Sequence, residues 1–277
     1  MEDLNKKQNQ NKDATQNLES KEKIIPKIEF VILSFEGELG LMQRFVSSKD
    51  TSFRKKLYTK SFPGLYDEVK DNKDWDFRKP IFEKYLKEKR NKRSERVANI
   101  KKGLEAWVKE KGSEYLSKLS KFYDYEFKSN IKVYINNVML GGQYNPSENS
   151  VFIYSGNNYD EEKTLLHEIT HIPLWFKIKN LFEELENTKD FLMAVGTLQW
   201  KISEILVPLI MSQELEVKDN YFDGGGHKFL HNTIKDKKVF DYFTKIYLDS
   251  RNAGDSFDVT MKKIYEEAKF HEKELDF

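Results

Sequence analysis

The sequence predicts an α+β fold, in which a small mixed or antiparallel sheet lies beside one central helix and extensive helical parts precede and follow them. Residues 131–135 and 150–154 are rich in β-branched and aromatic side chains and are bounded by turn residues, as strands are. Residues 159–172 then carry apolar side chains at helical spacing. The longer segments on either side also show helical spacing, so helix should outweigh strand.

The composition restricts the possible functions. The formal net charge is only +1 although 34% of the residues are charged, so nothing in the balance calls for a nucleic-acid partner. The absence of cysteine excludes disulfides, a thiolate metal site and a cysteine nucleophile. The chain has neither a run of about 18 apolar residues nor the apolar core of a signal peptide. We therefore expect a cytoplasmic protein that does not insert into a membrane.

The first part of the chain divides into a tail and a mostly helical region. Residues 1–24 contain almost no apolar side chains and cannot bury enough surface to offset the entropy of ordering, so we expect a disordered tail. Residues 25–128 form the mostly helical N-terminal region. It begins with an apolar, β-branched stretch at 28–35 that favours a strand, with a helix as the alternative, and Gly37 and Gly40 then predict a hairpin or a loop.

Two helices are clearest in this region. One begins near Ser94 and carries apolar side chains at spacings of three and four, and the other follows Gly112. Residues 87–93 form a basic run just before them. Such a run could contact nucleic acid, but the acidic residues around it favour a solvated helix face.

The remaining residues, 129–277, contain the features that indicate chemistry. The strand over 131–135 alternates apolar and polar side chains, and the strand over 150–154 leads towards the central helix. Between the two strands, residues 141–144 begin with two glycines and could pair with the second strand as a hairpin.

The central helix has recognisable start and stop signals. Asn158 and Glu161, three residues apart, indicate an N-cap and a capping box. From them we expect a helix from about residue 159 to Ile172, which Pro173 ends or kinks. Two more helices are expected beyond residue 239, separated by a break at Gly254.

This central helix contains the motif H-E-x-x-H, formed by His167, Glu168 and His171. Histidines four residues apart lie on one helix face, so both imidazoles can bind one metal ion. Zinc suits nitrogen donors, and a catalytic zinc site combines three protein ligands with an open position for water. Glu168 is placed to act as general base on that water. The alternative is an ordinary amphipathic helix with two solvent-facing histidines.

On these residues the chain resembles the zincin superfamily of zinc metallopeptidases, and within it the gluzincins, over roughly residues 131–231. The resemblance implies that the third metal ligand is a glutamate on a later helix. It also implies that the sheet edge before the motif helix binds the substrate backbone as an added strand, which indicates Gly142 and Tyr144 as substrate-binding residues. A purely structural hairpin is the alternative. Leu174 and Lys177 replace the glycine and third histidine of the metzincin motif, which separates the chain from that clan.

Glu204 is the strongest candidate for the third ligand. It has apolar residues on both sides within a segment, 188–211, that predicts a helix. A carboxylate in such a segment is costly unless it is paired or bound to a metal. Pro208 cannot donate the helix hydrogen bond to the Glu204 carbonyl, so we expect a bend there. A salt bridge with Lys201 is one alternative role for Glu204. The other candidate ligands are Glu183, Glu184 and Glu186.

A glycine-rich stretch downstream, residues 224–226, is flanked by Tyr221 and His227. Either side chain could donate a hydrogen bond to the oxyanion formed during peptide hydrolysis, so both are candidate catalytic residues. Asp223 could orient a ligating histidine. His227 and His231 also have i, i+4 spacing, but that pair lacks the adjacent glutamate. A flexible surface loop with ordinary histidines is the alternative for this segment.

These observations predict a zinc-dependent metallopeptidase, a hydrolase whose zincin-like catalytic region spans residues 129–277. Zinc is the expected cofactor, bound by His167, His171 and Glu204, and the expected partner is a peptide or protein substrate. The main alternative is a catalytically inactive zinc-binding regulatory or interaction protein that keeps the motif. A further alternative is a helical scaffold in which the motif is coincidental.

Overall fold

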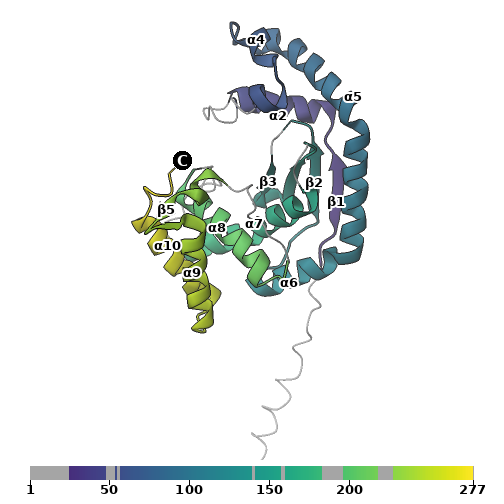
Figure 1. Cartoon of the computed structure of the whole chain (residues 1–277). Coiled ribbons are helices and arrows are strands. Elements are labelled where there is room, and N and C mark those ends of the chain that lie inside the picture. The colour runs from purple at the N-terminus through teal and green to yellow at the C-terminus, as the bar shows by residue number, and fades with distance from the viewer. Residues whose placement is uncertain are drawn as a thin grey trace, which may run out of the picture.

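The computed structural model describes residues 25–47, 54, 57–138, 141–156, 160–182, 196–217 and 227–276, and these form a mixed α+β fold (Figure 1). The predicted α+β class is confirmed. In chain order the described elements are β1 (Ile28–Ile32), α2 (Phe35–Ser47), η2 (Leu57–Ser61), α4 (Leu65–Val69), α5 (Trp75–Trp107), η3 (Val108–Gly112), α6 (Ser113–Tyr123), β2 (Ile131–Asn136), β3 (Gly142–Asn145), η4 (Pro146–Glu148), β4 (Ser150–Tyr154), α7 (Glu161–Leu181), α8 (Leu198–Gln213), η6 (Lys228–His231), β5 (Thr233–Ile234), β6 (Lys237–Lys238), α9 (Val239–Asn252) and α10 (Phe257–Phe270).

The main sheet has four strands in the order β1-β2-β4-β3. The strands β1, β2 and β4 are parallel, whereas β3 pairs antiparallel with β4 and forms one edge. The predicted strands over 131–135 and 150–154 are confirmed, as is the hairpin between 141–144 and the second of them. The strand predicted over 28–35 is also present, but it ends at Ile32.

One face of this sheet carries the main hydrophobic core. Side chains alternate between the two faces of a strand, so every second residue of β2 and β4 points towards α7. These residues are fully buried in one core with residues of α7 and α8, and α7 packs against β4 and β3. The inward-facing residues are Ile131, Val133, Val151 and Ile153. The sheet thus presents β3, its antiparallel edge, directly beside the motif helix (Figure 1).

Residues 35–47 form a helix, α2, so the predicted hairpin or loop at Gly37 and Gly40 is wrong. The helix starts where the Ser34 hydroxyl accepts a hydrogen bond from the Gly37 N–H over 3.0 Å. Apolar residues at helical spacing then enter a second hydrophobic core, and their burial outweighs the cost of two glycines in a helix. The buried apolar residues of α2 are Leu39, Leu41, Met42 and Val46.

The helices predicted near Ser94 and after Gly112 are present as α5 and α6, but α5 begins earlier, at Trp75. Side chains of α5 are therefore buried in both cores, with Phe82 in the second core and Leu104 in the main one. The basic run at 87–93 lies within α5, and the predicted solvated face is wrong in part. Lys89 is buried, and Arg90 pairs with the buried carboxylate of Glu38 over 2.5 Å.

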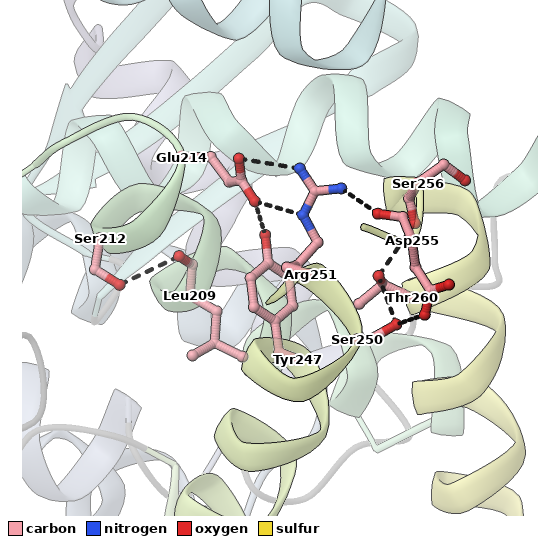
Figure 2. Close-up of polar contacts among 9 residues, drawn as sticks. All are labelled: Leu209, Ser212, Glu214, Tyr247, Ser250, Arg251, Asp255, Ser256 and Thr260. Atoms are coloured by element: carbon pink, nitrogen blue, oxygen red, sulfur yellow. Dashed lines mark hydrogen bonds and ion pairs between the residues drawn. The ribbon is translucent and has the colours of Figure 1, made fainter. Parts of the chain in front are cut away.

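The C-terminal end of α8 is joined to α9 by a partly buried polar network (Figure 2). The Glu214 carboxylate, which follows α8, accepts hydrogen bonds from the Tyr247 hydroxyl over 2.6 Å and from Arg251 Nε over 2.9 Å. Arg251 also donates to the backbone carbonyl of Asp255, which lies between α9 and α10. This network fixes the far end of the helix that carries Glu204.

Within the part of the chain that the structure describes, no helix combines the length and the apolar character needed to cross a lipid bilayer.

Candidate metal site

The motif residues lie on α7, and the helix differs from the prediction at both ends. Its N-cap is Asp160, whose carboxylate accepts a hydrogen bond from the Lys163 N–H over 3.0 Å, and the predicted cap Asn158 lies outside the described residues. Pro173 does not end the helix, which continues to Leu181. The apolar residues after Pro173 are buried in the main core, and this packing compensates for the hydrogen bond that proline cannot donate.

Glu204 reaches the motif from α8. The helix begins at a Thr197 N-cap, whose hydroxyl accepts a hydrogen bond from the Trp200 N–H over 3.2 Å. All residues of α8 from 200 to 211 are buried, and α8 packs against α7. The helix runs on through Pro208 to Gln213. The part of the predicted helix at 188–195 lies outside the described residues.

Three potential metal ligands converge where α7 and α8 meet. The Nε2 atoms of His167 and His171 are 2.9 Å apart. Glu204 Oε2 lies 3.2 Å from His167 Nε2, and Glu204 Oε1 lies 3.5 Å from His171 Nε2. Among the described residues, these are the three whose ligand atoms all lie within 4.8 Å of one another. The structure therefore brings together the three residues that the sequence selected as ligands, and this group could hold a metal ion.

The cluster is buried, which disagrees with the alternative of two solvent-facing histidines. The side chain of His171 is fully buried and that of His167 is only 13% exposed. Burial lowers the pKa of His171 to about 3, so its imidazole is neutral at physiological pH. Burial opposes ionisation of Glu204, but the surrounding histidines, His171 first, outweigh it and hold its pKa well below the ordinary value. Neutral imidazoles and an ionised carboxylate are the protonation states that bind metals.

Glu168 lies beside this cluster, against the edge strand. Its side chain is buried, and burial raises its pKa well above the ordinary value, with the Glu204 carboxylate adding to the effect. The carboxylate of Glu168 rests on the backbone of Gly142 in β3. A β-carbon at position 142 would stand 2.6 Å from Glu168 Cδ, so no other residue fits there without displacing the carboxylate. Gly142 thus contacts the predicted general base.

Tyr144, two residues further along β3, contacts the second histidine of the motif. The phenol ring of Tyr144 stacks on the His171 imidazole with 4.4 Å between ring centroids and 8° between the planes. Burial raises the pKa of Tyr144 well above its ordinary value, and the carboxylates of Glu204 and Glu168 raise it further. The Tyr144 side chain is therefore a neutral group inside the site.

His227 approaches the cluster from the segment before η6. Its Nε2 atom lies 3.2 Å from Glu204 Oε2, the same oxygen that His167 approaches. The ring packs edge-on against Trp200, with 4.6 Å between centroids, while 43% of the side chain stays exposed. His231 is exposed at the end of η6 and is not one of the three clustered ligands.

Several predicted residues lie outside the part of the chain that the structure describes. They are Glu183, Glu184, Glu186, Tyr221 and Asp223.

Sequence reasoning missed two features of this site. The first is the depth of burial of His171, because a helical wheel places both histidines opposite the core stripe, whereas α7 is enclosed by β3 on one side and α8 on another. The second is the contact of β3 with the motif. Gly142 and Tyr144 were selected for the edge strand that they form, and nothing local indicated that their inner face would meet Glu168 and His171.

No protein-family model, curated protein or solved structure matched this chain. The site therefore has to be interpreted from its own geometry.

Proposed function

We propose that this protein is a zinc-dependent metallopeptidase of the zincin type, with a gluzincin-like ligand set. One observation carries the proposal: the Nε2 atoms of His167 and His171 and the carboxylate of Glu204 converge within 4.8 Å, on two buried helices. A second carboxylate, Glu168, stands next to them. Two histidines with a glutamate as third ligand, and a further glutamate as base, form a ligand and base set used in zinc peptidases.

The donor set fits zinc better than it fits calcium or magnesium. Calcium and magnesium prefer oxygen ligands, and magnesium keeps several waters, whereas imidazole nitrogen favours zinc and other late first-row metals. The ligands also carry suitable charges, because His171 is neutral and Glu204 is ionised. A zinc ion held by His167, His171 and Glu204 would supply Lewis acidity that polarises the scissile carbonyl and acidifies water.

Glu168 is proposed as the general base. A base works best when its pKa lies near the operating pH, and burial moves the pKa of Glu168 upwards from that of an ordinary carboxyl group. Its carboxylate takes the proton of the attacking water and then passes it to the leaving amine of the peptide. The rim of the site is formed by His227, whose exposed ring is proposed to donate a hydrogen bond to the oxyanion, with Tyr221 as the second candidate for this role.

The edge strand β3 is proposed to bind the substrate backbone. β3 is the last strand of the described sheet, so β4 pairs with one of its edges only. The motif helix α7 packs against β3. A peptide that adds there as a further strand would pass beside Glu168 through backbone hydrogen bonds with residues 142–144. The antiparallel edge strand that packs beside the motif helix supports the zincin-like interpretation. The expected substrate is thus a peptide or an unfolded segment of a protein.

Metal content and hydrolysis together test the proposal. Protein purified without added metal should contain about one zinc per chain by elemental analysis, and Glu204→Ala should lose most of it. The parent should then cleave members of a peptide library, and Glu168→Gln should bind zinc equally well while its turnover falls at least about 100-fold. A parent that binds no zinc even with a modest excess would refute the metal site. Zinc binding without cleavage would refute the peptidase activity.

A second candidate function is supported by the position of His227. Its Nε2 atom lies 3.2 Å from the proposed ligand Glu204, so a small rotation would offer zinc a fourth protein ligand. Four protein ligands close a zinc site and make it structural. The protein would then be a catalytically inactive zinc-binding regulatory or interaction protein. His227→Ala separates the two: zinc affinity falls at least about tenfold if His227 is a ligand, and is kept while turnover falls if His227 serves the oxyanion.

A further inference from the structure

We propose that Tyr144 is a positioning residue for the metal site, whose ring holds the His171 imidazole in the orientation that binds the ion. This inference rests on the proposed metal site and adds a residue to it. It stands on the flat stack between the two rings, with centroids 4.4 Å apart and planes inclined by only 8°. The phenol ring therefore lies parallel to one face of the imidazole.

The second nitrogen of His171 explains why such support is needed. A metal-binding histidine usually donates its other ring N–H to a carboxylate, carbonyl or water, and this hydrogen bond fixes both tautomer and ring orientation. In the structure, Nδ1 of His171 is buried and has no hydrogen-bond partner among the described residues. No hydrogen bond at Nδ1 therefore limits rotation of the imidazole about its Cβ–Cγ bond. The flat contact with Tyr144 limits that rotation instead, because turning the ring would drive its edge into the phenol.

The pairing of strand and helix makes this contact a consequence of the fold. Residues two apart on a strand share a face, and residues three apart on a helix are neighbours. Gly142 and Tyr144 pair with Ile153 and Val151 of β4, whose side chains are buried in the main core. The inner face of β3 consequently meets α7 twice, as Gly142 against Glu168 and as Tyr144 against His171. A single strand thus supports both the base and a ligand.

Zinc affinity of matched variants tests the inference. Tyr144→Phe keeps the ring and should bind zinc within about threefold of the parent in competition with a chromophoric chelator, whereas Tyr144→Leu should bind about 10- to 100-fold more weakly, as loss of an outer-shell partner does. Tyr134→Leu is the control. Tyr134 stacks on Phe152, with 5.0 Å between centroids, and these residues alternate with the core-facing residues of β2 and β4. Its loss should leave zinc affinity unchanged.

A second measurement needs no metal. In the zinc-free protein, the His171 ring protons should show an upfield NMR shift from the Tyr144 ring current, present in Tyr144→Phe and absent in Tyr144→Leu. If Tyr144→Leu kept the parent's zinc affinity, or if Tyr144→Phe lost as much affinity as Tyr144→Leu, the ring would not be the positioning element. These readouts do not depend on hydrolysis. A parent that binds zinc but cleaves no peptide would therefore refute the peptidase and leave this inference standing, whereas a parent that binds no zinc would refute both.

Discussion

Position 142 has to be glycine because a carboxylate occupies the space beside its α-carbon. A β-carbon there would stand 2.6 Å from Glu168 Cδ and closer still to Oε1. Gly142→Ala should therefore displace the proposed base by a fraction of an ångström to an ångström, and misplacement on this scale costs up to about 100-fold in rate. Peptide hydrolysis by the variant should fall by one to two orders of magnitude. Zinc content should stay near that of the parent, because the three atoms nearest a β-carbon at position 142 all belong to Glu168 and none to a proposed ligand.

The matched control for this substitution is Gly103→Ala. Gly103 lies within α5, and a β-carbon there would meet nothing within 4 Å. Alanine in an exposed helix position stabilises by about 0.5–1 kcal/mol relative to glycine, so this variant should unfold at a slightly higher urea concentration with full activity. If Gly142→Ala were as active as Gly103→Ala, Glu168 would not work from the position seen in the structure.

Lys89 should make the free energy of unfolding depend on pH. Its ammonium group donates to the Ser61 carbonyl over 2.7 Å and to the Tyr154 hydroxyl over 3.2 Å. Burial, with Arg93 as the second cause, lowers the pKa of Lys89 to about 7 from an ordinary value of 10.5. Between these two pH values the unfolded chain binds a proton that the native protein lacks. Unfolding therefore takes up a proton there, and raising the pH stabilises the native state by about 1.4 kcal/mol per pH unit at most.

Comparison with Lys89→Met isolates this contribution. From pH 7.5 to pH 9.5, urea unfolding should show that the parent gains about 2–3 kcal/mol relative to the variant, since methionine cannot titrate. Lys87→Met serves as control because Lys87 is exposed on the same helix. A constant difference between parent and Lys89→Met over this range would show that Lys89 keeps its proton in the folded protein.

At the scale of elements, the sequence was informative where the signal is local. The strands β2 and β4 lie in runs of β-branched and aromatic residues, and turn residues bound these runs and the β3–β4 hairpin. These elements could therefore be predicted without knowledge of the fold. The hairpin or loop predicted at Gly37 is wrong, and the helix that was expected to end or kink at Pro173 continues to Leu181, because each residue lowers helix propensity only locally. In both cases apolar residues further along the helix are buried in a core, and that burial decides the outcome.

In the candidate site, too, local sequence signals could be read, whereas contacts made by tertiary packing could not. Glu204 could be predicted because a lone carboxylate within an apolar helix requires a partner, and His167 with His171 because four-residue spacing is a property of one helix. The stack of Tyr144 on His171 could not be predicted, since it depends on the register between β3 and β4 and on how α7 crosses them. The same holds for His227, which reaches Glu204 through tertiary packing against Trp200.

The network at the end of α8 gives a prediction about how elements are joined (Figure 2). Arg251 donates to both carboxylate oxygens of Glu214, over 2.9 and 3.3 Å. Arg251→Met would leave Glu214, whose side chain is only 18% exposed, with Tyr247 as its remaining partner in Figure 2. Chemical denaturation should show a loss of about 1–3 kcal/mol in the free energy of unfolding. The free energy of unfolding of Arg251→Lys should lie between those of the parent and of Arg251→Met, because an ammonium group cannot bind both oxygens as a guanidinium does.

Zinc affinity should not change in either Arg251 variant. Glu214 lies about 15 Å along the helix axis from Glu204, at about 1.5 Å per residue, so the network does not touch the metal site. A fall in zinc affinity parallel to the fall in stability would mean instead that the network sets the position of the whole of α8.

The described part of the molecule contains two hydrophobic cores that share one long helix. The main core lies between the sheet, α7, α8 and the C-terminal helices, whereas the second core lies among α2, η2, α4 and the first half of α5. Figure 1 shows α5 extending from one group of elements to the other beside β1. The proposed metal ligands belong to α7 and α8 and so to the main core alone. Separate cores can open as separate cooperative units.

Zinc binding should therefore protect the two cores unequally in hydrogen exchange. A ligand that binds only the folded state stabilises it by about 2.7 kcal/mol at 100 times its Kd, which slows exchange through opening of that unit about 100-fold. Amides of α7 and α8 should show this slowing when zinc is added, whereas those of α2 and α4 should exchange at an unchanged rate. In Glu204→Ala the same zinc concentration should slow neither group. Equal slowing in both cores would instead show that α5 couples them into one cooperative unit, so that the metal site stabilises the entire chain.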